Sequence, residues 1–358
     1  MRQPERIEHI QGKLLRWYGR HQRTLPWRGV GDPYAIWVSE IMLQQTQVAT
    51  VRPYYRRFLR RFASVRKLAK APLADVLKAW EGLGYYGRAR NLHRAAKQIV
   101  KDFAGKLPHT APELINLPGI GRYTAGAIAS IAFGLDEPVL DGNVTRVLCR
   151  VFRVRTNPKE SATQKKLWSL ARRLVPPGKA DLFNQALMDL GAIVCTPRRP
   201  DCLHCPLKTL CLAYKHNQQE ALPVKVKRAP LPHHDIGVGI VWKNGKILID
   251  QRKPEGLLGG LWEFPGGKVK EGETLPACVC REVREELAIR VRVGALLLTV
   301  KHAYSHFKIT LHVYHCTWLS GRPQALACID WKWVTVEALE KYAFPSANKK
   351  IIARLKEM

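Results

Sequence analysis

Two acidic residues of this chain stand where they could carry out acid–base chemistry. Glu40 falls in a predicted helix of residues 33–46 among mostly apolar neighbours one turn away, and removal from water raises the pKa of a carboxyl group, which suits a general acid. Asp141 precedes another predicted helix, for which we expect Asn143 to be the N-cap. Together the two carboxyl groups could cleave a bond through an oxocarbenium-like transition state, one protonating the leaving group and the other staying ionised beside the cation. An exposed helical glutamate and an aspartate that only shapes a turn are the structural alternatives.

The stretch LPGIGRYTAGAIAS, residues 117–130, predicts a turn between two helices. Thr110 can cap a short helix over 112–117, which ends at a Pro-Gly pair before the second helix begins. Backbone N–H groups near Gly119 and Gly121, at the start of that second helix, can hold a phosphate. A plain helix–turn–helix connection is the alternative, and the basic composition of the same region favours the phosphate.

The charge of the chain points to a polyanionic partner. Its 358 residues have a formal net charge of +30, which favours nucleic acid first and an anionic membrane surface second. The excess is +24 in residues 1–232 and +6 in residues 233–358, so we expect the polyanion mainly at the first part. No apolar run of about 18 residues and no N-terminal hydrophobic segment occurs, so we expect no membrane contact, no secretion, and a cytoplasmic, nucleoid-associated location.

The nine cysteines are unevenly placed, and their odd number without a secretory signal argues for a reducing compartment. Four of them form a Cys-x6-Cys-x2-Cys-x5-Cys loop, made of Cys195, Cys202, Cys205 and Cys211. Four thiolates in so short a segment can enclose either zinc or an iron–sulfur cluster, in a structural role because no activating group accompanies them. The loop also carries Arg198 and Arg199, which suit contact with phosphate.

The hydrophobic patterns divide the chain into two domains and a linker. Residues 1–216 predict a helical domain, with helical spacing of apolar residues in the segments 33–46, 53–62, 88–103, 122–134, 144–153 and 163–175. Residues 217–232 lose this pattern and contain three prolines, which predicts a linker. Residues 233–358 predict an α/β domain with one helix near 276–287 and strands at 236–242, 246–250, 290–300 and 309–319.

A series of motifs resembles the helix–hairpin–helix DNA glycosylases and, among them, the MutY-type adenine glycosylases. These motifs are LPWR (25–28), SEIMLQQTQV (39–48), GLGYYGRARNL (82–92), LPGIGRYTAGA (117–127), LDGNVTRV (140–147) and the cysteine loop. The resemblance implies an all-α glycosylase domain followed by a Nudix-like domain, and a structural, DNA-contacting [4Fe–4S] cluster in the cysteine loop. It also implies a monomer that excises adenine mispaired with 8-oxoguanine or guanine in double-stranded DNA.

The resemblance implies roles for individual residues as well. Glu40 would protonate adenine N7, Asp141 would stabilise the sugar cation, and Tyr123 and Asn143 would position the acid and the ribose. Lyase-type relatives such as endonuclease III carry a lysine at the position of Tyr123, and a phenol cannot form a Schiff base, which implies a monofunctional glycosylase. The residues expected to contact the substrate are Trp27, Arg28 and Gln185 in the adenine pocket, with Gln45 and Tyr85 as wedges that offset the cost of base flipping.

Residues 262–289 resemble the Nudix box of MutT-type hydrolases, with Gly267, Glu273, Arg281, Glu282, Glu285 and Glu286 at the matching positions. Three glutamates on one helix face could hold Mg²⁺ on a pyrophosphate, although Ala288 stands where the box normally has glycine. MutY-type enzymes use such a domain to recognise 8-oxoguanine. Residues 302–306, HAYSH, match their recognition loop, with Tyr304 where phenylalanine is usual and with Ser305 and His306 as the expected contacts to the damaged guanine.

Two alternatives to an adenine glycosylase remain at this point. One is a Mg²⁺-dependent Nudix hydrolase of oxidised nucleoside triphosphates with a DNA-binding helical domain. The other is a protein that binds the lesion without catalysis, which the presence of Glu40 and Asp141 within their motifs disfavours.

Overall fold

The computed structural model of the chain describes residues 3–225 and 229–358, which form two compact units. The first unit consists of the described residues of Met1–Ala69 and Arg94–Arg228, and the second of Lys70–His93 and Ala229–Met358. Residues 226–228 of the predicted linker lie outside the described residues. Within the described ranges, no helix combines the length and apolar content needed to cross a bilayer.

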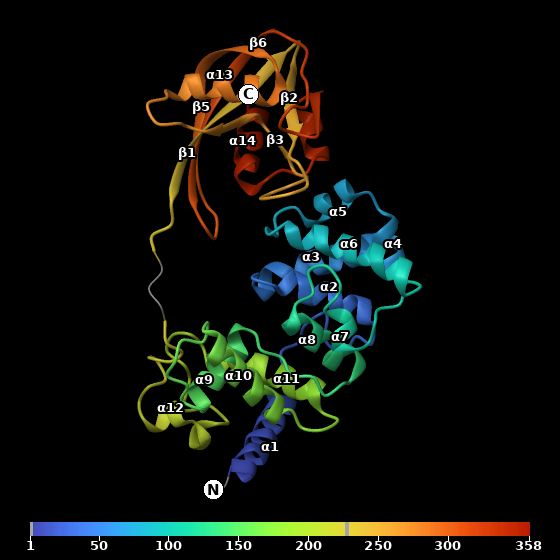
Figure 1. The fold of residues 1–358 in the computed structure, drawn as a ribbon, viewed down its shortest axis with the longest axis vertical. Coiled ribbons are helices and arrows are strands. Elements are labelled where there is room, and N and C mark those ends of the chain that lie inside the picture. The colour runs from blue at the N-terminus through green and yellow to red at the C-terminus, as the bar shows by residue number, and fades with distance from the viewer. Residues whose placement is uncertain (1–2, 226–228) are drawn as a thin grey trace. The chain divides into compact units, whose positions relative to one another are not determined.

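Helices make up the chain as far as the linker (Figure 1), as the sequence predicts. Each of the six predicted helical segments overlaps a helix in the structure. In chain order the elements are α1 (Gln3–His21), α2 (Pro33–Leu43), α3 (Val48–Arg61), α4 (Val65–Lys70), α5 (Leu73–Trp80), α6 (Gly87–Asp102), α7 (Ala111–Leu114), α8 (Arg122–Phe133), α9 (Gly142–Val151), α10 (Ser161–Leu174), α11 (Ala180–Asp189), the π-helix η1 (Leu190–Val194), η2 (Lys208–Leu210) and α12 (Leu212–Lys215).

The core of the first unit joins helices from both ends of its sequence. Leu14 of α1, Leu167 of α10 and Phe183 of α11 are fully buried in one apolar cluster with α9. Burial of such side chains stabilises the fold by about 2 kcal/mol each. The cluster therefore fixes α9 and α11, which both contribute residues to the site described below.

A close contact positions α8, the second helix of the hairpin. A Cβ atom on Gly126 would lie 2.4 Å from the carbonyl oxygen of Pro138, so the chain before α9 can approach α8 only because glycine stands there. At the start of the hairpin, Thr110 and Glu113 form a reciprocal capping box on α7, as expected for Thr110 as a helix cap.

The second unit contains a mixed sheet with helices on its faces (Figure 1). Its strands follow the order β3-β2-β1-β6-β5, with β1 and β6 parallel, β4 paired with β1 and β7 paired with β2. The elements are β1 (His233–Lys243), β2 (Lys246–Gln251), β3 (Trp262–Glu263), β4 (Gly266–Lys268), α13 (Leu275–Leu287), β5 (Arg290–Ala303), β6 (Lys308–Ser320), β7 (Asp330–Val334), η3 (Glu337–Lys341) and α14 (Ser346–Lys356).

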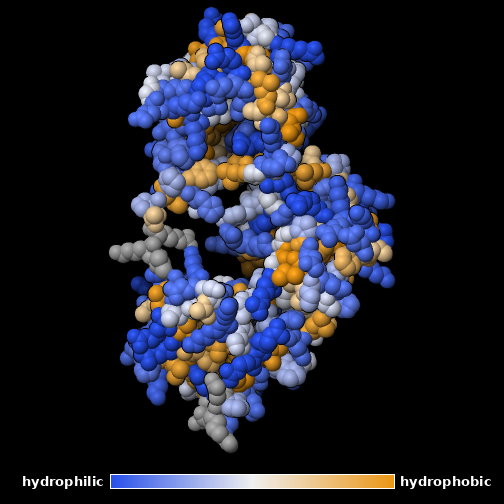
Figure 2. Space-filling view, in the orientation of Figure 1, coloured by the Kyte–Doolittle hydropathy of each residue, from blue (hydrophilic) through white to orange (hydrophobic). Residues whose placement is uncertain are grey.

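Two apolar clusters hold this sheet between helices. Val279 and Val283 of α13 pack with Val241 on one side of the sheet. Phe344 and Ile351, at α14, pack with residues of β1 and β2 in the other cluster. Polar side chains cover most of the visible face of each unit, and the apolar patches between them are small (Figure 2).

The segment 70–93 falls within the predicted helical domain but packs with the second unit. Lys78 Nζ donates to the carbonyl oxygen of Tyr342 at 2.9 Å, and the N–H of Phe344 donates to Glu81 Oε1 at 3.1 Å. These partners lie more than 250 residues apart, so local sequence patterns do not reveal their contact.

Candidate active site

A large pocket in the first unit brings together the residues predicted to do chemistry. Its volume is about 1060 Å³, and its wall comes from α2, the start of α8, the start of α9 and α11. The predicted site residues that line it are Trp27, Arg28, Glu40, Gln45, Gly121, Tyr123, Asp141, Asn143 and Gln185. Residues from distant parts of the chain thus meet in one cavity.

Glu40 is buried on α2, with 5% of its surface exposed. Burial raises its pKa from 4.5 to about 7, and the negative charge of Asp141 adds to this effect. The phenol of Tyr123, in the first turn of α8, donates a hydrogen bond of 2.9 Å to Glu40 Oε2 and opposes the shift. A carboxyl group with a pKa near neutrality can hold a proton and deliver it.

Asp141 has a different setting, at the N-terminus of α9. Its Oδ1 accepts a hydrogen bond of 2.7 Å from the N–H of Val144, and its Oδ2 accepts one of 3.1 Å from the side-chain amide of Asn143. The prediction of Asn143 as the N-cap is therefore wrong: α9 begins at Gly142 and Asp141 caps it. The carboxylate takes this role because its oxygens reach the unpaired N–H groups of the first turn.

Burial raises the pKa of Asp141 above its ordinary value, and the hydrogen bonds from Val144 and Asn143 and the charge of Arg146 oppose this rise. Glu40 receives one hydrogen bond from an uncharged phenol, whereas Asp141 receives several donors at a helix N-terminus. Hydrogen-bond donors favour the ionised form of a carboxyl group. Of the two carboxyl groups, Glu40 is therefore the one that binds a proton first as the pH falls.

Arg146, which the sequence did not single out, fixes the position of Asn143. Its Nη2 donates to Asn143 Oδ1 at 2.8 Å and to the carbonyl oxygen of Gly191 at 2.7 Å, and its Nε donates to the carbonyl oxygen of Cys195 at 2.7 Å. One guanidinium thus ties the amide beside Asp141 to the π-helix and to the first cysteine of the loop.

Trp27 and Arg28 are held in place on the pocket wall. Trp27 is buried edge-on against Tyr55, with ring centroids 5.4 Å apart. Arg28 forms a two-pronged ion pair with Asp189, at 2.6 and 2.7 Å, and Arg23 binds the same carboxylate. Asp189 is fully buried, and no local pattern in the sequence reveals its part in the site.

Gln45 and Gln185 line the same pocket from two sides. Gln45 has a positive φ of 57°, which an L residue rarely adopts and which projects it from the turn after α2. The side chain of its neighbour Gln44, which the sequence did not single out, donates to Thr124 Oγ1 at 3.1 Å. Gln185 Nε2 donates to the carbonyl oxygen of Asp181 at 3.1 Å.

The hairpin has the geometry of an anion site. Gly119 has a φ of 81°, in the left-handed region that favours glycine, and Gly121 is the N-cap of α8 with no side-chain cap. Within the described residues, the N-cap of α8 thus supplies no side-chain hydrogen bond to the first N–H groups of the helix, which are the groups that bind phosphate at a helix N-terminus.

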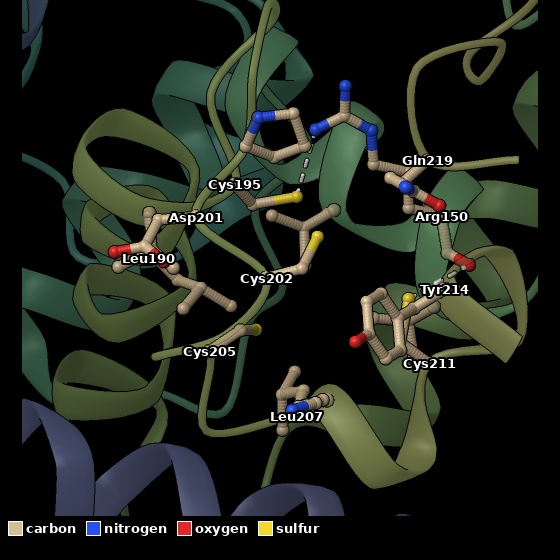
Figure 3. Close-up of a pocket in the computed structure, with 15 residues that line it drawn as sticks. Arg150, Leu190, Cys195, Asp201, Cys202, Cys205, Leu207, Cys211, Tyr214 and Gln219 are labelled. Atoms are coloured by element: carbon tan, nitrogen blue, oxygen red, sulfur yellow. Dashed lines mark hydrogen bonds between the residues drawn. The ribbon is translucent and has the colours of Figure 1, made fainter. Parts of the chain in front are cut away.

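The four predicted cysteines line a second pocket of the first unit, with Leu190, Val194 and Leu207 among the apolar side chains around them (Figure 3). Arg150 Nη1 donates to Cys195 Sγ at 3.3 Å, and Cys211 Sγ lies 3.5 Å from the carbonyl oxygen of Arg150. In the described part of the chain, no three His, Cys, Asp or Glu side chains are gathered closely enough to hold a single metal ion. Arg198 and Arg199 lie exposed on the same loop.

The second unit brings two other predicted contact residues together. The hydroxyl groups of Tyr85 and Ser305 are hydrogen bonded, and Tyr85 is 40% exposed. The ring of Tyr304 packs edge-on against His302 and at a tilt against Phe307, with centroid distances of 4.6 and 4.9 Å, in the loop that carries Ser305 and the exposed His306. Residues 84–88, 90–91 and 302–307 line one pocket.

A single arginine binds three of the four Nudix-box glutamates. Arg281 Nε donates to Glu273 at 2.6 Å, and its Nη1 donates to Glu282 at 2.6 Å and to Glu285 at 3.0 Å. Glu286 accepts a hydrogen bond of 3.1 Å from the N–H of Gly266. The helix face predicted to hold Mg²⁺ is thus partly neutralised by the protein itself.

The fold and the pocket define a helix–hairpin–helix base-excision enzyme joined to a Nudix-type unit. Residues 38–173 match the HhH-GPD superfamily of base excision DNA repair proteins, and residues 237–354 match the NUDIX domain. Adenine DNA glycosylases of Homo sapiens and of Buchnera aphidicola subsp. Baizongia pistaciae (strain Bp) are 37% and 41% identical to this chain. The alignments cover 96% of the chain and 73% and 96% of the relatives. The chain belongs to the adenine DNA glycosylase family.

Solved structures agree with this assignment of the fold. A thermostable thymine-DNA glycosylase matches 59% of the chain and 98% of its own length, with a TM-score of 0.55 and 32% identity. A non-covalent endonuclease III–DNA complex matches 61% of the chain and all of its protein chain, with a TM-score of 0.52 and 21% identity, which supports the fold alone.

Proposed function

We propose that this protein excises adenine from double-stranded DNA where the adenine is paired with 8-oxoguanine or guanine. The observation that carries the proposal is the pair of carboxyl groups in one pocket, with Glu40 buried at a pKa of about 7 and Asp141 held by several donors. The relatives are adenine DNA glycosylases, which indicates adenine as the excised nucleobase. The pocket provides the proton donor and the carboxylate that cleavage of a glycosidic bond requires.

The reaction follows from these settings. Glu40 gives its proton to N7 of the flipped adenine, the C1′–N9 bond breaks, and its electron pair leaves with the base. Asp141, ionised at the N-terminus of α9, stabilises the positive charge that develops on the sugar. Water then adds to C1′ and releases a proton, which restores Glu40 and leaves an abasic site in an intact strand. Tyr123 holds Glu40 in place and offers no amine for strand cleavage.

A duplex with one A:8-oxoguanine pair, analysed with and without hot alkali, tests this proposal. Wild-type protein in a buffer without Mg²⁺ should give strand breaks only after alkali, and Glu40→Gln should give none. Tyr123→Lys, run alongside, tests whether an amine at this position adds lyase chemistry. If the strands stay intact after alkali with folded, cluster-loaded wild-type protein, this result would refute the proposed removal of adenine.

We assign recognition of the opposite 8-oxoguanine to the loop around Ser305, with Tyr85 beside it. Ser305→Ala should reduce the preference for A:8-oxoguanine over A:G about tenfold, which corresponds to one hydrogen bond of about 1.4 kcal/mol. The rate on A:G duplexes should stay close to that of the wild type. Equal losses on both substrates would argue against this assignment.

Hydrolysis of free nucleotides is the competing use of the second unit. Because Ala288, with a positive φ of 57°, stands where the Nudix box of the hydrolases normally has glycine, recognition without hydrolysis fits this unit better. Incubation with 8-oxo-dGTP and Mg²⁺ separates the two uses. Turnover that Glu285→Gln abolishes would restore hydrolysis as an activity.

The four-cysteine pocket fits a [4Fe–4S] cluster, because four thiols from one short loop line it among apolar side chains (Figure 3). Cys195, Cys202, Cys205 and Cys211 would hold the cluster, which would brace the loop that carries Arg198 and Arg199. Iron and acid-labile sulfide measured on purified protein test this, with about four of each expected per chain. Cys202→Ser should lower both, whereas zinc without sulfide would contradict the cluster.

A further inference from the structure

Helix α3 carries a face of positive charge that the pocket chemistry does not use. Residues 41–74 contain eight Lys or Arg and no Asp or Glu. On α3, Val51, Tyr55 and Phe58 are buried, whereas Arg56, Arg57 and Arg60 are exposed on the opposite side. We name these three arginines the α3 basic face.

Like charges stand one helical turn apart on the α3 basic face. Arg56 and Arg60 are four residues apart, and Arg57 and Arg60 are three apart, so each pair repels across one helical turn. No carboxylate among the described residues forms an ion pair with any of the three. Arg57 instead lies over the ring of Tyr54, at 4.5 Å from its centroid. Such repulsion is relieved when a polyanion binds.

The position of α3 relates this face to the pocket. Gln47 is the N-cap of α3, and Gln47, Val48 and Ala49 line the candidate active site. From there the helix extends for 14 residues, or about 21 Å. The α3 basic face therefore starts about 12 Å from the pocket rim, which corresponds to three or four base pairs of a duplex at about 3.4 Å each.

We propose that the α3 basic face binds the phosphate backbone of the DNA that flanks the lesion, about three to five base pairs from the flipped nucleotide. Guanidinium groups suit this partner because they bind phosphate oxygens with two parallel hydrogen bonds. Phosphate contacts do not depend on the base sequence of the DNA, and this contact extends the binding surface beyond the lesion. This inference extends the proposed function. It rests on that function only in taking DNA as the partner, and it does not depend on base removal.

The salt dependence of binding tests this proposal on the full, cluster-loaded chain. A triple variant with Arg56→Gln, Arg57→Gln and Arg60→Gln is compared with the wild type on a lesion duplex of about 30 base pairs. Each lost phosphate contact lowers the slope of log K against log [KCl] by about 0.9, so the triple variant should lose about 2 to 3. On a duplex cut to about three base pairs on each side of the lesion, the two proteins should bind alike.

A matched control removes the same charge elsewhere in the first unit. Arg94, Lys97 and Lys101 form an exposed face of α6, and their replacement by Gln should change the slope by less than 1. Equal changes in both triple variants, or an unchanged slope for the α3 variant, would overturn the proposal. Binding to an undamaged duplex is measured in the same way. A protein that binds DNA with this salt dependence but removes no base would refute the proposed function and would still support this inference.

The rate of base removal shows whether the α3 variant is folded. Single-turnover base removal at saturating protein and low salt should stay within twofold of the wild type, because Arg56, Arg57 and Arg60 lie outside the pocket wall. A loss of this rate together with an unchanged salt slope would assign the three arginines to folding instead and would overturn the proposal.

Discussion

The phenol of Tyr123 donates a hydrogen bond of 2.9 Å to Glu40, so the hairpin helix α8 directly sets the acidity of the buried carboxyl group on α2. Burial raises the pKa of Glu40 to about 7, and this hydrogen bond holds it below the value that burial alone would give. The two effects act against each other on the group that we propose to be the general acid.

Tyr123→Phe should therefore move the alkaline limb of the pH–rate profile to higher pH. Without the donor, ionised Glu40 loses a hydrogen bond of about 1.5 kcal/mol, which raises the pKa by about one unit above the wild-type value near 7. The maximum rate should also fall, because the carboxyl group is less well positioned. Single-turnover rates from pH 5 to 9 measure both effects, with Tyr54→Phe as a control that lies outside the pocket wall. An alkaline limb at the same or lower pH would contradict the role of this bond.

Glu40→Gln should remove activity and increase stability at alkaline pH. The pKa of Glu40 is raised from 4.5 to about 7 in the folded state, so its contribution to stability is complete below about pH 4.5 and is lost as the pH rises to 7. This loss amounts to about 3 kcal/mol, which a neutral glutamine avoids. The apparent melting temperature of the variant should exceed that of the wild type at pH 8 and match it near pH 4.5. A constant difference across this range would exclude Glu40 as the source.

Local sequence patterns predicted most of the elements and the nature of the acid. The sequence predicts Thr110 as a helix cap, and the apolar neighbours of Glu40 predict the raised pKa that its burial produces. In both cases the deciding neighbours lie within one helical turn. The strands of the second unit were predicted for the same reason, since alternation along the chain records which face is buried.

The same patterns did not reveal contacts between distant residues. Asp189 and Arg28 are 161 positions apart, and nothing near either residue indicates the other. The sequence predicts Asn143 as the cap of α9, but asparagine and aspartate are equally good caps, and only the fold shows that the helix begins one residue after Asp141. The packing of 70–93 with the second unit depends on side chains such as Lys78, whose partner lies far along the chain.

Asp189→Asn should destabilise the first unit and loosen the pocket wall. Asp189 is fully buried and binds Arg28 and Arg23, whose side chains are only 13% and 26% exposed. The asparagine leaves two guanidinium groups without their counter-charge, and we expect a loss of about 2 kcal/mol, less than for a fully buried pair because both arginines reach water. The melting temperature measures this loss, and it should persist at 1 M KCl because a buried pair is poorly screened. Asp181→Asn, on the same helix, is the matched control, and an equal decrease in both variants would argue against the ion pair.

Gly191→Ala should reduce base removal by displacing Asn143. A Cβ atom on Gly191 would lie 2.6 Å from Asn143 Cβ and 3.1 Å from its carbonyl oxygen, so α9 must shift away from the π-helix. That shift breaks the hydrogen bond of 3.1 Å from Asn143 to Asp141 and strains the Arg146 bridge to the carbonyl oxygen of Gly191, with an overpacking cost of about 1–3 kcal/mol.

The measurement is the single-turnover rate at saturating protein, together with the melting temperature and the affinity for lesion duplex. We expect the rate to fall at least tenfold, which is the consequence of about 1.4 kcal/mol at the transition state, while the affinity changes by no more than a few fold. Gly19→Ala in α1 is the control, because a Cβ atom at Gly19 meets nothing within 4 Å and alanine favours the helix. A wild-type rate for Gly191→Ala would mean that the position of Asn143 is not important for catalysis, and the contact between η1 and α9 would then serve packing alone.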